Sequence, residues 1–207
     1  DEINSLASQV AALNNRISSS NGADVESLRD QRGVLLTRLS QLAGVTVTER
    51  VDGPADVSIG QGLALVVGKD AFHVDVTTSL PSGMAAISIG GTDITSELTQ
   101  GQVGGLLQVR DTVLPGYATR LDQMAYDLAT RVNVLHTAGV DANGNPGGNF
   151  FVPPTGVAGA AAAFAVAPAV AADSRLVAGS STTSAGDNQT ARAIAGLRDA
   201  RVMSGGT

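Results

Sequence analysis

The chain has 207 residues, a formal net charge of −6 and 15% charged residues, and it contains neither cysteine nor tryptophan. Its length allows one or two domains with a real hydrophobic core. The lack of cysteine excludes disulfide frameworks, cysteine metal sites and thiol catalysis. The acidic balance argues against nucleic acid as a partner, because no basic patch is available to neutralise phosphates.

Two amphipathic helices are predicted at the start of the chain. In the first, over residues 3–17, apolar side chains recur at helical spacing: Ile3, Leu6, Val10, Leu13 and Ile17. A polar turn at 18–22 leads to a second helix, for which Asp24 is a good N-cap and which runs to about Ala43 before Gly44 ends it. Because the loop between them is short, we expect the two helices to be antiparallel neighbours.

After Gly44 the apolar pattern changes to that of β-strands. Short strand candidates, separated by Gly, Pro or Asp, lie at 45–50, 56–59, 63–67, 71–76 and 85–89. Gly60-Gln61-Gly62 is typical of a hairpin turn. These features predict a small antiparallel β-rich domain over residues 45–98.

The longest helical pattern lies between Gly104 and Gly139. Its apolar seam follows steps of three and four residues and comprises Leu114, Tyr117, Leu121, Met124, Leu128, Val132 and Leu135. An isolated helix cannot bury such a seam, so we expect these residues to pack in the core of a helical rod: Leu114, Tyr117, Leu121, Met124, Leu128 and Leu135. Pro115 predicts a break or kink near residues 112–116, and Gly139 is placed to act as a C-cap.

The last third of the sequence is rich in turn formers. A dense turn signal at 141–148 precedes Phe150-Phe151-Val152, which we expect to anchor this region in the core. Residues 163–178 predict a short strand and a turn, with one helical turn as a further option. Asp187 is predicted to cap a last helix, whose apolar side carries Ala191, Ile194, Leu197 and Val202.

No motif indicates catalysis, a metal or a cofactor. Asp141, Asn143 and Asn145 resemble the start of a calcium loop, but Pro146 replaces its glycine and Val152 its final acid. Gly68-Lys69 lacks the other residues of a P-loop, and neither an HExxH nor a GxSxG motif is present. We expect His73 and His136 to serve in capping or packing. The apolar run 157–172 is shorter than the roughly 20 residues of a membrane-spanning helix.

Three segments carry a resemblance to a known family. They are SLRDQRGVLLTRLSQLAGVTV (27–47), GQVGGLLQVRDTVLPGYATRLDQMAYDLATRVNVLHTAGVDANGNPGGNFF (101–151) and GDNQTARAIAGL (186–197). Through them the chain closely resembles the flagellar hook-associated proteins that form the first hook–filament junction zone. The motifs that carry it include Asp30-Gln31-Arg32, Arg110-Asp111, Leu121-Asp122-Gln123, the run from Asn133 to Gly139, and Gly186-Asp187-Asn188.

The resemblance implies a structural protein, with no catalytic residue and no cofactor. Members of the family leave the cell through the flagellar type III export channel without a cleaved signal, and they stack as a ring between hook and filament. The implied partners are the hook protein, the second hook–filament junction protein, further copies of the same subunit and an export chaperone, with no nucleic acid and no membrane. The resemblance also implies that the terminal helices that drive polymerisation in the family, and the region that binds the chaperone, lie outside these 207 residues.

The start of the chain supports the same interpretation. It has no Met and no cleavable signal peptide, and it begins within a helical pattern, so we expect a piece of a longer protein that is monomeric by itself.

The sequence therefore predicts an α+β fold. A long antiparallel helical bundle, the rod domain, is formed by residues 1–44 plus 99–207, and a small antiparallel β-rich domain is inserted at 45–98. The predicted function is to join hook to filament. The alternatives are another axial protein, either flagellin-like or the second junction protein, and a secreted adhesin or binding module, which the absence of tryptophan weakens. A fused peptidoglycan hydrolase would need paired carboxylates, which the sequence does not locate.

Overall fold

The computed structural model of the chain describes residues 1–20, 24–51, 53–79 and 83–199. The chain divides into two compact units, which we call unit 1 (Asp1–Val113) and unit 2 (Leu114–Thr207). This division differs from the predicted one, which grouped residues 1–44 with 99–207 and set 45–98 apart. The packing of unit 1 explains the difference.

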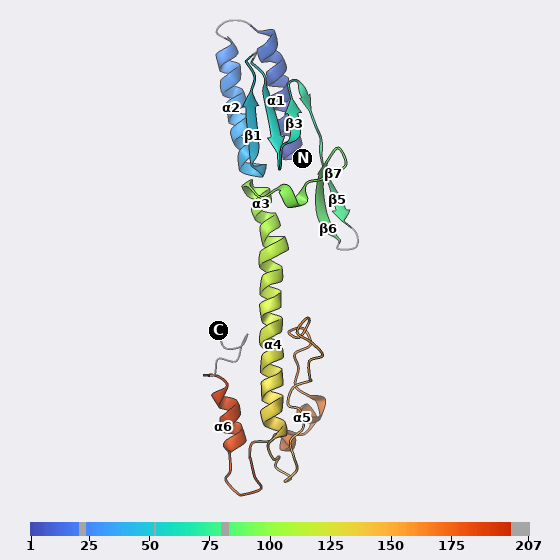
Figure 1. Cartoon of the computed structure of the whole chain (residues 1–207), viewed down its shortest axis with the longest axis vertical. Coiled ribbons are helices and arrows are strands. Elements are labelled where there is room, and N and C mark those ends of the chain that lie inside the picture. Colours follow the sequence, from blue (N-terminus) through green and yellow to red (C-terminus); the bar gives the residue numbers. More distant parts are fainter. Residues whose placement is uncertain (21–23, 52, 80–82, 200–207) are drawn as a thin grey trace. The chain divides into compact units, whose positions relative to one another are not determined.

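Unit 1 begins with two helices that pack on each other and on an antiparallel sheet (Figure 1). The helices are α1 (Glu2–Ser19) and α2 (Asp24–Ala43), as the sequence predicted. The sheet has the order β1-β2-β3-β4, with β1 (Val45–Glu49), β2 (Ala55–Ile59), β3 (Leu63–Val67) and β4 (Asp70–Ala71). Gly44 ends α2 because it adopts a φ of 57°, a left-handed conformation, while its N–H donates to the carbonyl of Ser40 at 2.9 Å.

A second antiparallel sheet completes unit 1. It contains β5 (Val74–Ser79), β6 (Met84–Ile89) and β7 (Thr92–Asp93) in chain order, and the 3-10 turn Thr95–Glu97 follows. The predicted antiparallel β-rich character of this region is therefore confirmed, as is the hairpin turn at Gly60-Gln61-Gly62, which joins β2 to β3. Residues 21–22 of the turn predicted at 18–22 lie outside the described residues.

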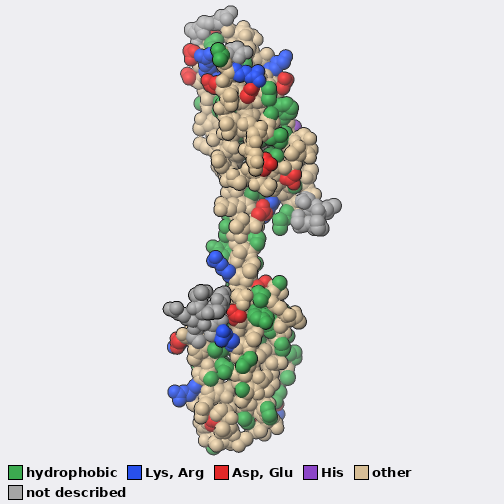
Figure 2. Space-filling model, in the orientation of Figure 1, with side chains coloured by type: hydrophobic (Ala, Val, Ile, Leu, Met, Phe, Trp, Pro, Cys, Tyr) green, Lys and Arg blue, Asp and Glu red, His purple; other side chains and the backbone are tan. Residues whose placement is uncertain are grey.

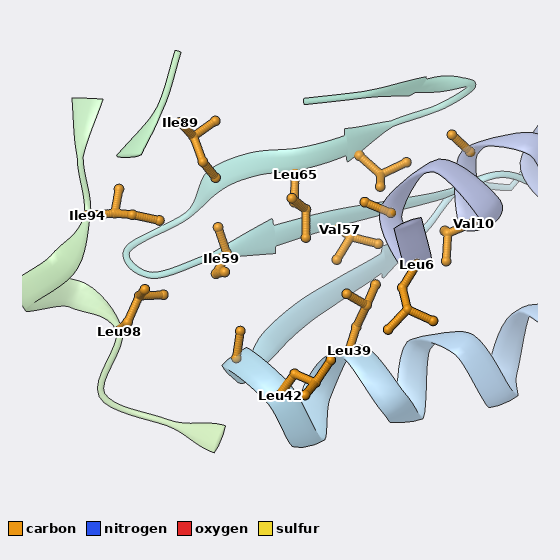
Figure 3. Packing of buried hydrophobic residues seen from close by; sticks show 14 residues of the cluster. Leu6, Val10, Leu39, Leu42, Val57, Ile59, Leu65, Ile89, Ile94 and Leu98 are labelled. Atoms are coloured by element: carbon orange, nitrogen blue, oxygen red, sulfur yellow. The ribbon is translucent and has the colours of Figure 1, made fainter. Parts of the chain in front are cut away.

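One hydrophobic core joins both helices to both sheets (Figure 3). Its members include Leu6, Val10, Leu39, Leu42, Val57, Ile59, Leu65, Ile89, Ile94 and Leu98. Each large aliphatic side chain buried in this way contributes about 1.5–3 kcal/mol. The strands of residues 45–98 thus share their core with α1 and α2, and this is why residues 1–44 fall in the same unit as the strands.

The long helical pattern of the sequence corresponds to three consecutive helical segments. They are α3 (Gly101–Gln108), a π-helical turn (Val109–Val113) and α4 (Leu114–Thr137). The irregularity predicted at 112–116 is present as this π-helical turn. Pro115 lies in the first turn of α4, directly after the π-helical turn, and it has no N–H to donate to the preceding turn.

Unit 2 is built around α4. It also contains α5 (Pro168–Ala172), the 3-10 turn Ser174–Leu176 and α6 (Gln189–Gly196), which packs beside α4 (Figure 1). The short strand predicted within 163–178 is reduced to a single bridge between Phe151 and Val166. Residues 200–207 of the predicted rod, with Val202 of its predicted last helix, lie outside the described part of the chain. No helix of the described residues is long and apolar enough to cross a membrane.

The helix α4 ends without a left-handed glycine. Gly139 was predicted to be its C-cap, yet α4 ends at Thr137 and the φ angle of Gly139 is not positive. A side chain at Gly139 would lie 2.8 Å from the methyl group of Thr190, so here glycine is required by close packing against α6. Among the described residues of unit 2, α6 is the longest helix that packs on α4, so the long rod bundle is not formed within either unit.

Candidate interaction surface

An exposed apolar stripe runs along α4. It consists of Leu114, Tyr117, Leu121, Met124 and Leu128, which we call the α4 stripe and whose exposed fractions lie between 37% and 57%. Steps of three and four residues place these side chains on one face of the helix. Leu135, the sixth predicted rod-core residue, is half-buried. The described part of the chain therefore does not form the predicted rod core around these residues, and their packing in a rod stays a prediction.

The stripe is uncovered because the helices expected to cover it are used elsewhere. In α1 and α2 the apolar faces are buried in the core of unit 1, where Val10 and Leu39 have no exposed surface. In unit 2, α6 has only eight residues and reaches only part of the seam. Val132, near the C-terminal end of α4, is buried. Figure 2 shows hydrophobic side chains distributed over the visible face of unit 2, with few charged groups between them.

A pocket of about 310 Å³ lies where the covered part of α4 meets the stripe. We call it the α4 pocket, and its lining consists of Leu128, Val132, His136, Phe150, Phe151, Val177, Ala178, Gly179, Ala191 and Ile194. Phe150 and Phe151 pack edge to face with ring centres 4.9 Å apart. Both rings are half-buried and line the pocket, and Val152 is 39% exposed, so the predicted anchoring in a buried core is not confirmed.

His136 closes the floor of the α4 pocket and is completely buried. Its Nδ1 lies 2.7 Å from the carbonyl oxygen of Gly148, and its Nε2 lies 2.9 Å from the backbone nitrogen of Ala178. A carbonyl accepts and an amide donates, so these bonds assign the ring proton to Nδ1 and make Nε2 an acceptor. The packing role expected of His136 is confirmed.

The other histidine is placed differently. The side chain of His73 is 70% exposed, and its Nε2 lies 3.2 Å from the amide nitrogen of Asn4 and 3.6 Å from Asp75. The expected packing role of His73 is therefore wrong. The cause is that β4 ends at Ala71, so His73 stands in the connection between the two sheets rather than within a strand.

Three asparagines of helices pair with the backbone of a distant segment. The amide of Asn133 accepts from the N–H of Phe151 at 2.8 Å and donates to its carbonyl at 3.0 Å. Asn14 binds Ala55 in the same way. Asn4 binds Val74 in the same way. This role was not predicted from the sequence, although an asparagine on an apolar helix face, as at Asn14 and Asn133, is a usable signal, because a buried amide needs hydrogen-bond partners.

Asp122 fixes a loop of unit 2 on α4. Its carboxylate accepts the N–H groups of Gly159 at 2.8 Å and Ala161 at 2.9 Å. These two backbone bonds hold the pKa of Asp122 below its ordinary value, and the bond from Gly159 has the larger effect. Asp122 lies next to Leu121, so the loop is fixed to the helix immediately beside the stripe.

Asp187 organises the chain that leads into α6. It accepts the N–H of Gln189 at 3.0 Å and further bonds from the backbone and hydroxyls of Ser181 and Thr182. The bond from Gln189 is the largest cause that holds the pKa of Asp187 well below its ordinary value. The N-cap of α6 is Asn188 rather than the predicted Asp187, which precedes it and still binds the N–H of the first helical residue, Gln189.

Asp141 makes a turn rather than a metal site. Its Oδ1 accepts the N–H groups of Asn145 and Asn143, both at 2.8 Å, and these bonds lower the pKa of Asp141. Among the residues that the structure describes, no group of three or more His, Asp or Glu side chains is placed to hold a metal ion. The apolar stripe and its pocket are the surface features of unit 2 whose chemistry suits an amphipathic helix.

Comparison with known proteins identifies relatives of this chain. Residues 1–151 match the family described as "Flagellar hook-associated protein FlgK helical domain". The chain is 34% identical to flagellar hook-associated protein 1 of Escherichia coli, over 73% of the chain and 30% of that protein. It is 33% identical to the protein of the same name from Salmonella typhimurium, over 72% of the chain and 29% of that protein. It is 27% identical to flagellar hook-associated protein 1 of Bacillus subtilis, over 72% of the chain and 36% of that protein.

A solved structure is similar as well. It is that of the flagellar hook junction protein FlgK from Burkholderia pseudomallei, with a TM-score of 0.57 and 34% identity. The similarity covers 73% of this chain and 29% of that chain. The chain thus spans about a third of the length of the proteins that it matches.

Proposed function

Because the chain belongs to the family of the flagellar hook-associated protein FlgK helical domain, we propose that it is part of a structural protein that joins the flagellar hook to the filament. The match over residues 1–151 carries this proposal, and it favours a hook-associated protein over the flagellin-like and adhesin alternatives. The site of action is the hook–filament junction, outside the cell. The role is structural and needs no catalysis or cofactor.

The partners follow from a place in the axial assembly. They are the hook protein on one side, the second hook–filament junction protein on the other, and further copies of the same subunit around the ring. An export chaperone binds segments of the full-length protein that lie outside these 207 residues. Without those segments the chain is expected to be monomeric, and sedimentation that shows stable rings would contradict this.

The α4 stripe is the part of the chain that we assign to assembly. Leu114, Tyr117, Leu121, Met124 and Leu128 are exposed at coiled-coil spacing, and Leu135 continues the same face. In the full-length protein we place these six residues in the core of a helical rod, where helices from outside this chain cover them. Burial of such side chains contributes about 1.5–3 kcal/mol each, enough to hold a long helix in place.

Deletion of the gene that encodes this chain tests the junction role. We expect cells with hooks but no filaments, and flagellin released into the medium. The intact gene should restore filaments. Filaments of normal number on the deletion strain would refute the proposed function.

A matched pair of variants tests the stripe in the same strain. Leu121→Asp places a charge on a side chain that is 55% exposed in this chain, and it should fail to restore filaments. Val34→Asp changes an apolar residue of α2 that is 70% exposed and outside the stripe, and it should restore them. If both variants restore filaments, the stripe is not an assembly surface.

A further inference from the structure

We propose that the α4 pocket is a socket for one large apolar side chain of the helix that covers the α4 stripe, and that it sets the register of that helix along α4. This inference rests on the proposed function. The occupant is an amphipathic helix of the same protein, from the part outside these 207 residues, since the chain spans only about a third of its relatives.

The lining of the pocket selects an apolar group. Apart from His136, its side chains are aliphatic or phenyl groups, and both ring nitrogens of His136 are engaged by Gly148 and Ala178. A polar or charged group that entered would lose its hydration and find no partner, at a cost of roughly 1–3 kcal/mol or more. The pocket therefore discriminates against polar side chains.

The volume of the pocket suits one large side chain. Its 310 Å³ is about twice the roughly 150 Å³ of an apolar cavity that binds benzene. A leucine, methionine or phenylalanine side chain fits such a space with part of its own helix turn. An alanine would leave most of it empty, and filling a cavity of this kind recovers contacts that are otherwise lost.

The position of the pocket makes it a register device. Leu128 is both the last residue of the stripe and a wall of the pocket, and Val132 and His136 continue the same face at steps of four residues. A helix that packs on the stripe with the same repeat can slide by one heptad and still bury its seam. Only one register places a large side chain in the socket, so the socket removes this ambiguity.

A charge next to the stripe adds a second condition on the occupant. Arg120 is exposed, directly precedes Leu121, and forms no ion pair with any residue that the structure describes. On a covering helix an acidic residue opposite Arg120 would pair with it at the edge of the seam, as flanking charges do in coiled coils. The occupant is therefore a helix with an apolar seam, an acidic residue beside that seam, and one large apolar side chain at the socket.

The first experiment tests the chemistry of the pocket in the 207-residue chain. The probe is the apolar dye N-phenyl-1-naphthylamine, followed by its fluorescence. Ala191→Phe narrows the pocket from α6, and Ala193→Phe is the control, because Ala193 is exposed on the same helix but does not line the pocket. We expect Ala191→Phe to weaken binding at least about tenfold and Ala193→Phe to leave it unchanged.

Two outcomes of the dye titration would overturn the proposal. One is equal binding by the original chain and by both variants. The other is loss of binding in the stripe variant Leu121→Gln but not in Ala191→Phe, which would place the dye on the stripe rather than in the pocket. Circular dichroism of each variant shows that the helices remain.

The second experiment uses the full-length protein in the deletion strain. We expect Ala191→Phe to lower the number of filaments per hook at least about tenfold, and Ala193→Phe to restore them. If Ala191→Phe restores filaments while Leu121→Asp does not, the socket is wrong and the proposed function stands. If neither variant has an effect, the stripe itself is not the assembly surface.

Discussion

The two units of this chain are stabilised by different means. In unit 1 the largest fully buried side chains are mostly aliphatic, among them Leu39, Ile59 and Leu65. Among the described residues of unit 2 the largest fully buried side chain is His136, and most of the buried apolar residues are alanines. With so small an apolar core, unit 2 depends more on polar side chains that bind backbone groups, as Asn133 does with Phe151, whereas in unit 1 the same kind of bond, from Asn14 to Ala55, adds to a large apolar core.

The difference shows where each unit keeps its large apolar side chains. In unit 1, large apolar side chains of the helices and sheets are buried together and form a core. In unit 2, the large apolar side chains of the α4 stripe are exposed, while the fold relies on hydrogen bonds and close contacts between small residues. A unit of this kind is suited to be completed by another helix, and this is how unit 2 would become part of a rod.

The largest effect is expected in the core of unit 1. Leu39 has no exposed surface, and Leu39→Ala should lower the free energy of unfolding by about 2–5 kcal/mol, since it removes apolar contacts and leaves a cavity. Calorimetry measures this loss of stability, and amide exchange in α2 and β2 shows whether it arises in unit 1. An unchanged transition would mean that the core of unit 1 is not its main source of stability.

Close packing in unit 2 is tested by a pair of neighbouring glycines. A methyl group at Gly147 would collide with the carbonyl oxygen of His136 and lie 2.7 Å from Cβ of Ala178, whereas one at Gly148 would meet nothing within 4 Å. Gly147→Ala should therefore cost about 1–3 kcal/mol, and Gly148→Ala should be close to neutral. Urea unfolding monitored in unit 2 compares them, and equal stability of both variants would contradict the close approach.

Acid should loosen unit 2. The pKa values of Asp187, Asp122 and Asp141 are lowered in the folded chain by backbone and hydroxyl donors, while in the unfolded chain they are near the ordinary value of about 3.9. Their contribution to stability is therefore present above about pH 4 and is lost as the pH falls through the folded values. Amide protection at Gly159 and Ser181 should stay constant down to about pH 4 and fall as the pH is lowered from there to 2.5, and Asp187→Asn should weaken this dependence near Ser181.

Local signals in the sequence were enough to predict many elements. The helices at 3–17 and 24–43, the strands after Gly44 and the hairpin at 60–62 follow from spacing and turn residues, and all are present. The resemblance identified the family because it depends on residues off the seam, such as Asp122 and Asn133. Those residues bind backbone groups of distant segments.

The partners of each apolar face could not be predicted. Leu39 and Leu121 lie on similar seams at similar spacing, yet one is fully buried and the other is 55% exposed. Periodicity shows that a face seeks burial, but it does not show which element supplies the cover or whether that element lies in the same chain. For the same reason the pocket beside Leu128, built from segments far apart in the sequence, had no sequence signal.

The smallest effect is expected at Leu121. In this chain the side chain is 55% exposed, so Leu121→Ala should change the free energy of unfolding by no more than about 0.5 kcal/mol, in contrast to Leu39→Ala. Thermal unfolding of the two variants under the same conditions is a direct measurement. A loss at Leu121 as large as that at Leu39 would mean that the stripe is already buried within these 207 residues. In the full-length protein, where the stripe is covered, the same substitution should lower the free energy of unfolding by about 2–5 kcal/mol. The difference between the two losses, in this chain and in the full-length protein, measures how much the covering helix buries Leu121.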